Sequence, residues 1–204
     1  NGNVLSLTSP DGSVIYYSYD ALNRQTGSST YCNDEYGRLT TIEKHVTYTW
    51  DGQVSTSTDA NGNVTRNEYD SRGRVIRIID AANGITAKFY DIAGRLTAIV
   101  SPNQYDAAKT LEQMGRTGYL YDVMGRVKTV TQVYFDAEAG QWVTFVEKAY
   151  LYDAAGNVIR EEDALGYASG TGDTIDQRIA SGYGTTYSYD LAGHVLTVLD
   201  PVSK

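Results

Sequence analysis

The sequence predicts an all-β fold of repeated antiparallel β-hairpins that form a curved or spiralling sheet. Two observations carry this prediction. A unit of the form Tyr-x-Tyr-Asp-x-x-Gly-Arg-Val/Leu recurs along the chain, and many of the 20 glycines fall where a tight turn needs one. Self-similarity at a spacing of tens of residues indicates a stacked array, and an array is usually a scaffold rather than a catalyst.

The repeated unit is clear in five copies and recognisable in three more. The clear copies span residues 67–75, 88–96, 119–127, 150–158 and 187–195; variants span 17–24 and 31–39, and residues 48–54 are interpreted as a shortened copy. The residues expected to define the motif are Tyr19, Asp20, Asn23, Arg24, Asp34, Gly37, Arg38, Tyr69, Asp70, Gly73, Arg74, Tyr90, Asp91, Gly94, Arg95, Tyr121, Asp122, Gly125, Arg126, Tyr152, Asp153, Gly156, Tyr189, Asp190 and Gly193.

Each copy is interpreted as one hairpin that bends at its Asp-x-x-Gly step. The two tyrosines, at i and i+2, point to the same face of a strand. The Asp side chain can accept a hydrogen bond from the backbone N–H two residues on, and Gly accepts the positive φ of a type I turn with a bulge. Asn23 replaces this Gly in the first full copy, and Asn is the next best residue at positive φ.

This turn sets a register between the two strands of each hairpin. In the copy at 67–75, Asp70 is expected to face Arg74 on one side of the sheet, and Tyr69 to face Val75 on the other. We expect the tyrosine side to pack on neighbouring hairpins, and each Arg to pair with its own Asp or to stack on a Tyr. Exposed Asp–Arg pairs of this kind contribute little to stability.

A second turn signal separates the copies. Asp-Ala followed by Gly within two or three residues occurs at 59–62, 80–84 and 163–166. These segments are predicted to be turns at the other end of the strands. Turns at alternate ends connect the strands into an antiparallel meander.

The array is expected to span residues 1–204 without a domain boundary, as a fragment of a larger repeat protein, with three insertions. These lie at about 101–118, 133–146 and 167–184. Residues 105–114 have helical propensity, residues 133–146 resemble a second hairpin that turns at 136–140, and residues 167–184 resemble an exposed loop. Insertions in repeat proteins usually lie on one face, where binding tends to occur.

The composition argues against several classes of function. The formal net charge of −8 disfavours a nucleic-acid groove, and no apolar run is long enough to cross a bilayer. One cysteine, Cys32, cannot form an intrachain disulfide. The two histidines, His45 and His194, suggest no catalytic arrangement, since His194 occupies the Arg position of its copy. We expect no enzyme activity and no catalytic, cofactor or metal site.

The motif resembles that of the YD-repeat family, also called the RHS-repeat family. Residues 69–75 and 121–127 fit its signature closely, and the copies cover nearly the whole chain. The resemblance implies hairpins joined side by side into a long spiralling sheet, here part of an RHS/YD-repeat shell. Large bacterial members, such as RHS toxins, Tc toxin complexes and wall-associated proteins, enclose a toxic domain, and teneurins use a related shell at animal cell surfaces.

Two functions from different classes follow from this resemblance and from the residues. The first is a structural module of a β-shell or surface scaffold, secreted or at the cell surface, whose partners are the rest of the parent protein and an enclosed toxin domain. The second is a module that binds carbohydrate or a cell-surface partner through exposed Tyr and the insertion loops. Open strand edges also predict edge-to-edge self-association.

Overall fold

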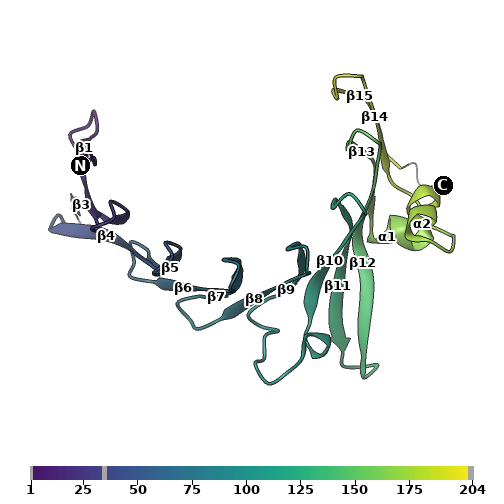
Figure 1. The fold of residues 1–204 in the computed structure, drawn as a ribbon, viewed down its shortest axis with the longest axis horizontal. Coiled ribbons are helices and arrows are strands. Elements are labelled where there is room, and N and C mark those ends of the chain that lie inside the picture. Colours follow the sequence, from purple (N-terminus) through teal and green to yellow (C-terminus); the bar gives the residue numbers. More distant parts are fainter. Residues whose placement is uncertain (1, 34–35, 202–204) are drawn as a thin grey trace. The chain divides into compact units, whose positions relative to one another are not determined.

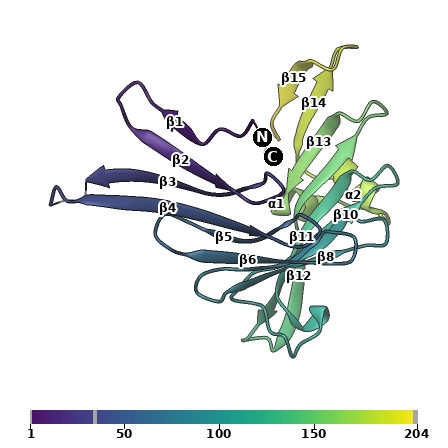
Figure 2. The same cartoon turned by 60° about the vertical axis from the view of Figure 1, so that its left-hand side comes forward.

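The computed structural model describes residues 2–33 and 36–201 and is all-β, as predicted. Its described strands form one antiparallel sheet of fifteen strands in chain order (Figures 1 and 2). The strands are β1 (Ser6–Thr8), β2 (Val14–Tyr19), β3 (Gln25–Asn33), β4 (Leu39–Tyr48), β5 (Val54–Thr58), β6 (Val64–Tyr69), β7 (Val75–Ile79), β8 (Ile85–Tyr90), β9 (Leu96–Val100), β10 (Arg116–Tyr121), β11 (Val127–Asp136), β12 (Gln141–Tyr152), β13 (Val158–Asp163), β14 (Thr185–Tyr189) and β15 (Val195–Leu199).

Chain connectivity alternates between two kinds of bend. Seven motif turns connect each even-numbered strand to the next strand, from β2–β3 to β14–β15, and the opposite turns connect each odd-numbered strand to the next. All three predicted insertions fall among the opposite turns, between β9 and β10, within the β11–β12 hairpin, and between β13 and β14. The motif turns therefore keep a constant length while the opposite turns vary.

The chain divides into two compact units, residues 1–87 and 88–204, which are described separately. In the unit of residues 1–87, β1 to β7 pair in sequence, and residues 85–87 of β8 continue the pairing on β7. Ala87 is the one buried apolar side chain among the described residues of this unit. A single layer of strands supports this unit mainly through ladder hydrogen bonds and contacts within the layer.

The unit of residues 88–204 contains most of the buried core. Ala98, Val100, Met114, Val133, Ala149 and Ile179 are buried there. The helices α1 (Ala164–Ser169) and α2 (Ile175–Ser181) contact both β12 and β13 (Figure 1). The register aligns three buried residues beside one another, one from each of three strands: Thr129, Ala149 and Glu162.

The hairpin register agrees with the sequence-based prediction. Tyr69 pairs with Val75, Tyr121 with Val127 and Tyr152 with Val158, each immediately after a bulge. The interpretation of residues 48–54 as a shortened copy was wrong. Thr49 N–H donates to the Gln53 carbonyl at 2.8 Å, the same bond that Asp70 N–H makes to the Arg74 carbonyl, so this turn has the full length.

Two of the three insertions differ from their predicted conformations. The helical expectation for residues 105–114 was largely wrong, since that stretch contains only a 3₁₀ turn, Leu111–Gln113. Residues 133–146 form a hairpin, as predicted, which continues β11 into β12 without a break.

The exposed loop predicted for residues 167–184 was also wrong, because the insertion folds into α1 and α2. Asp163 caps α1 through Gly166 N–H at 2.8 Å, and Thr174 caps α2 through Gln177 N–H at 3.2 Å. The glycines that suggested a loop instead permit close packing: a Cβ built on Gly166 would lie 1.9 Å from the Tyr183 carbonyl oxygen. No helix among the described residues is long and apolar enough to cross a bilayer.

Candidate functional site

The motif turns share one hydrogen-bond pattern, which the Asp side chain organises. In the turn at Asp70, the Asp70 N–H donates to the Arg74 carbonyl at 3.0 Å, and the Gly73 N–H donates to the Asp70 carbonyl at 3.0 Å. The Asp70 Oδ1 accepts from the backbone N–H groups of Arg72 at 2.9 Å and Arg74 at 3.0 Å. One carboxylate oxygen therefore holds two backbone donors of the bend.

The fourth turn position favours glycine because φ is positive there. Gly73 has φ 78° and Gly94 has φ 90°, and Asn23 takes this position at φ 61°. The remaining glycines at this position behave in the same way: Gly52, Gly125, Gly156 and Gly193. A side chain branched at Cβ would be strained there.

The second Asp oxygen pairs with the Arg side chain across the turn. The Arg Nε lies 2.7 Å from the Asp Oδ2 in the turns of Asp20, Asp70 and Asp91, and 2.6 Å from it in that of Asp122. The Arg74 backbone N–H, followed by its side chain, holds the pKa of Asp70 below its ordinary value. The Asp20, Asp91 and Asp190 carboxyls have lowered pKa values for the same first reason, the backbone N–H four residues on.

Several motif hairpins are joined to the preceding one by the tyrosine directly before the turn. Its hydroxyl donates to the backbone carbonyl of the residue directly after the preceding motif turn. The Tyr152 hydroxyl lies 2.7 Å from the Val127 carbonyl oxygen, and Tyr121 lies 2.7 Å from that of Leu96. The same bond, called a rung below, occurs from Tyr48 to Gln25, Tyr69 to Val54 and Tyr189 to Val158, and from Tyr19 to Val4 near the start of the described chain.

The Arg of one turn also stacks on the tyrosine of the next. The Arg126 guanidinium carbon lies 4.4 Å from the ring centre of Tyr152, Arg95 lies 4.8 Å from that of Tyr121, and Arg24 lies 4.3 Å from that of Tyr48. A guanidinium at such a distance is attracted by the face of the ring. The Arg thus meets both of the partners expected for it, its own Asp and a neighbouring Tyr, at the same time.

Three motif turns substitute other residues while keeping the pattern. Asn157 and His194 occupy the Arg position and still meet the second oxygen of Asp153 at 2.9 Å and of Asp190 at 3.0 Å. In the turn at 49–53, the Thr49 hydroxyl oxygen accepts the Gln53 backbone N–H at 3.0 Å. The Gln53 amide nitrogen then reaches the Gly73 carbonyl at 2.8 Å, a contact with the next hairpin.

The variant copy at 31–39 lies among the opposite turns, because it connects β3 to β4. Asp34 lies outside the described residues. Gly37 has φ 75°, and the Arg38 guanidinium lies over the Tyr36 ring at 5.3 Å, within its own turn. At Tyr90 and Asp91 the motif keeps its turn bonds, with Asp91 N–H donating to the Arg95 carbonyl at 2.9 Å.

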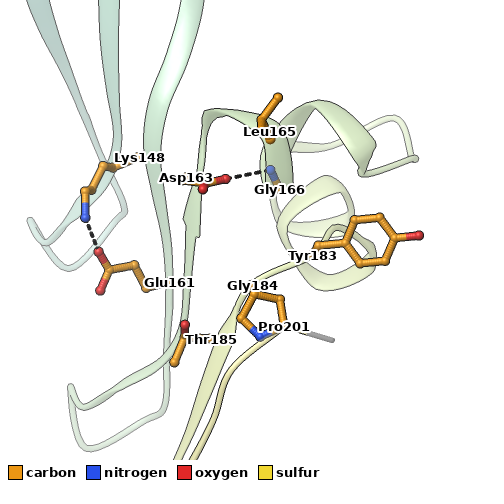
Figure 3. Close-up of a pocket in the computed structure, with 9 residues that line it drawn as sticks. All are labelled: Lys148, Glu161, Asp163, Leu165, Gly166, Tyr183, Gly184, Thr185 and Pro201. Atoms are coloured by element: carbon orange, nitrogen blue, oxygen red, sulfur yellow. Dashed lines mark hydrogen bonds and ion pairs between the residues drawn. The ribbon is translucent and has the colours of Figure 1, made fainter. Parts of the chain in front are cut away.

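Surface cavities occur at several places on the described part of the chain. A cavity of about 420 Å³ beside the α1–α2 insertion is lined by Lys148, Glu161, Gly166, Tyr183 and Thr185, among others. The Lys148 Nζ lies 2.5 Å from the Glu161 Oε1. Figure 3 shows this pair, with the Tyr183 ring pointing away from it. Within residues 2–33 and 36–201, no three His, Cys, Asp or Glu side chains gather as a metal site would require.

Sequence reasoning missed two features of this arrangement. It assigned the motif tyrosines to packing and did not foresee that their hydroxyls reach a carbonyl of the preceding hairpin. The fixed position of Tyr before the turn Asp, where Phe occurs in none of the clear copies, is a signal that could have indicated a hydrogen-bonded hydroxyl. It also missed the buried Glu162 and its partner Arg160, which no motif marks.

Comparison with known proteins finds a family model that matches parts of the chain and solved structures with a similar fold. The RHS Repeat family model matches residues 1–31, 48–85 and 69–106. No curated protein sequence matches the chain.

Solved structures with a similar fold include components of Tc toxins. The Tc holotoxin pore of Photorhabdus luminescens with mutant TccC3 is similar at TM-score 0.59 and 17% identity, and the TcdB2–TccC3–Cdc42 crystal structure at 0.59 and 16%. The TcdB2–TccC3 crystal structure is similar at 0.58 and 17%. Each match covers 100% of this chain and 12% of the other chain, so this chain spans about an eighth of those proteins.

Proposed function

We propose that this chain, which the RHS Repeat family model matches over residues 1–31, 48–85 and 69–106, is a non-catalytic wall segment of a β-shell or surface scaffold. The ladder of rungs supports this proposal. The recurring side chains of the motif close its turns and join one hairpin to the next, as the hydroxyl of Tyr152 and the guanidinium of Arg126 do. A wall of this kind encloses or displays a partner rather than transforming it.

The finer form of the proposal is a shell from a secreted or cell-surface protein that delivers a toxin, with the toxin domain enclosed. Similar folds in Tc toxin components support this form. The test is electron microscopy and limited proteolysis of the complete gene product. We expect this segment in the wall of a hollow shell, with an enclosed domain that resists protease until the shell is opened. A solid particle, or a flanking domain cleaved as readily as a free one, would contradict the proposal.

A second candidate function is the binding of carbohydrate, and one observation favours it. The tip of the β11–β12 hairpin carries four exposed aromatic side chains, in two edge-to-face pairs: Tyr134 with Phe145 at 6.3 Å and Phe135 with Trp142 at 5.4 Å between ring centres. Aromatic faces can stack on sugar rings. The motif tyrosines do not favour this function, because their rings and hydroxyls are engaged by neighbouring hairpins.

A glycan array separates the two functions. Carbohydrate binding predicts reproducible binding to particular glycans that is lost on substitution of Trp142 by Ser. The matched control is Trp50→Ser. Trp50 is also a tryptophan, 97% exposed, but it lies in a motif turn away from the β11–β12 tip. No binding above the level of an unrelated β-protein would leave the scaffold as the function.

The outermost strands of the described sheet, β1 and β15, predict self-association. Leu5 and Leu7 on one edge and Leu196 and Leu199 on the other are each more than half exposed. A strand edge that is open and apolar pairs readily with another chain. We expect light scattering across a concentration series to show a rising mean mass, and Leu196→Lys to reduce it. A constant monomer mass at high concentration would rule this out.

A further inference from the structure

Glu162 is the only charged residue that is buried among residues 2–33 and 36–201. It is 1% exposed as a residue, and its side chain is fully covered. It lies on β13 opposite Ala149, itself 0% exposed, and Ile179 of α2 is also 0% exposed. The α1–α2 insertion contacts β12 and β13, so it covers a titratable group.

Only one of the two oxygens of the Glu162 carboxylate accepts a hydrogen bond. Its Oε1 accepts from Arg160 Nε at 3.0 Å, whereas its Oε2 is buried and has no partner. The guanidinium of Arg160 also donates, through Nη2, to the carbonyl of Gly182, which is the C-cap of α2. Arg160 thus ties the carboxylate on the sheet to the end of the second helix.

The other charged groups on the elements packed against Glu162 do not hydrogen-bond its Oε2. Asp163, the N-cap of α1, adds a like charge next to it. From α2, Asp176 pairs with Lys128 at 2.7 Å, and Arg178 lies in the last turn. From β12, Lys148 pairs with Glu161. Burial is the largest cause that raises the pKa of Glu162, and the bond and charge of Arg160 act against it.

The insertion packs directly against this carboxylate. A Cβ built on Gly182 would lie 2.8 and 2.9 Å from its two oxygens, and one on Gly184 would lie 2.6 Å from its Cγ. A buried carboxylate with an unmet oxygen is costly, and the neutral acid is less so. The docked insertion therefore favours the protonated form of Glu162.

We propose that the α1–α2 insertion is a pH-sensitive cover, whose docking on β12 and β13 strengthens when Glu162 takes up a proton. In the undocked state Glu162 is solvated and titrates near its ordinary 4.5. Docking is then strongest below that pH and weakens as the pH rises toward the raised pKa of the docked state. Release uncovers the Glu162 carboxylate and removes Gly166 and Tyr183 from the wall of the 420 Å³ cavity.

Hydrogen exchange of the full chain tests this proposal. Between the two pKa values, the opening constant of residues 164–184, corrected for intrinsic exchange, should rise up to tenfold per pH unit, the slope for one proton. Glu162→Gln, which is neutral at every pH, should remove that slope. The matched control is Glu161→Gln on the same strand, whose carboxylate is partly exposed and paired with Lys148; it should keep the slope.

A second measurement holds even if Glu162→Gln fails to fold. Carbon-detected NMR titration of the glutamate carboxyls in the unaltered chain should show one Glu with a pKa above the ordinary range. All glutamates titrating at or below that range would overturn the proposal, as would equal pH slopes for the unaltered chain and Glu162→Gln.

Discussion

The motif ladder and the α1–α2 insertion join neighbouring strands in opposite ways. A motif turn such as that of Asp122 keeps its ion pair partly exposed, and its carboxylate accepts backbone donors as well as Arg126. The insertion instead buries Glu162 with one oxygen unmet. The difference teaches that a motif carboxylate can stay ionised, because solvent and backbone N–H groups stabilise its charge. The docking of the insertion depends instead on whether Glu162 is protonated.

The largest expected effect tests the close packing of the insertion. Gly166→Ala puts a methyl group 1.9 Å from the Tyr183 carbonyl oxygen and should destabilise the insertion by about 2–3 kcal/mol through overpacking. In a freely solvated helix the same change would stabilise by about 1 kcal/mol, so the sign is diagnostic. Hydrogen-exchange protection of residues 164–184 measures it. The control is Ala168→Gly, an exposed position of α1 where only helix propensity should act.

The next effect tests the turns of the ladder. Gly94 has φ 90°, and Gly94→Val should cost about 1–3 kcal/mol because a branched side chain is strained there. The melting temperature should fall accordingly. Ala93→Val, one residue earlier in the same turn and exposed, should change it far less. Equal melting temperatures for the unaltered chain and Gly94→Val would mean that the turn assignment is wrong.

A smaller effect tests the rungs. Tyr152→Phe deletes the hydroxyl that donates to the Val127 carbonyl at 2.7 Å and should lower the free energy of unfolding by about 1 kcal/mol. Tyr150 lies two residues earlier on the same strand, and its ring centre is 6.4 Å from that of Tyr152. Tyr150→Phe serves as the control, since its hydroxyl is outside the ladder. If both changes cost the same, the rung has no separate contribution.

The smallest expected effect per residue is the loss of stability of the motif turns at low pH. The motif carboxyls have pKa values lowered by the folded turns, so their contribution to stability is present above the ordinary value of 3.8 and is lost as the pH falls through the lowered pKa. We expect acid to loosen the ladder under conditions in which the insertion docks most firmly. Asp70→Asn should reduce the acid response of its hairpin, as followed by hydrogen exchange. A pH response unchanged by Asp70→Asn would contradict this.

The features that could be predicted from the sequence are those set by local backbone geometry. The Asp-x-x-Gly step implied the bend and its positive φ, and the bend in turn implied that Tyr121 faces Val127. Contacts between hairpins were beyond local rules, because a Tyr hydroxyl and its acceptor lie 15 to 31 residues apart. The insertion was misjudged because glycine signals a loop as well as close packing, and only the neighbours of Gly166 and Gly182 distinguish the two.

Every rung ends on a main-chain oxygen, and this has a consequence for how such genes can change. The acceptor belongs to Gln in one copy, to Leu in another and to Val in the rest, since any amino acid offers the same atom. A copy can therefore be duplicated, lost or exchanged between genes without a matching change in its neighbour. An array built on such bonds can gain or lose a copy while each remaining tyrosine still meets a carbonyl oxygen.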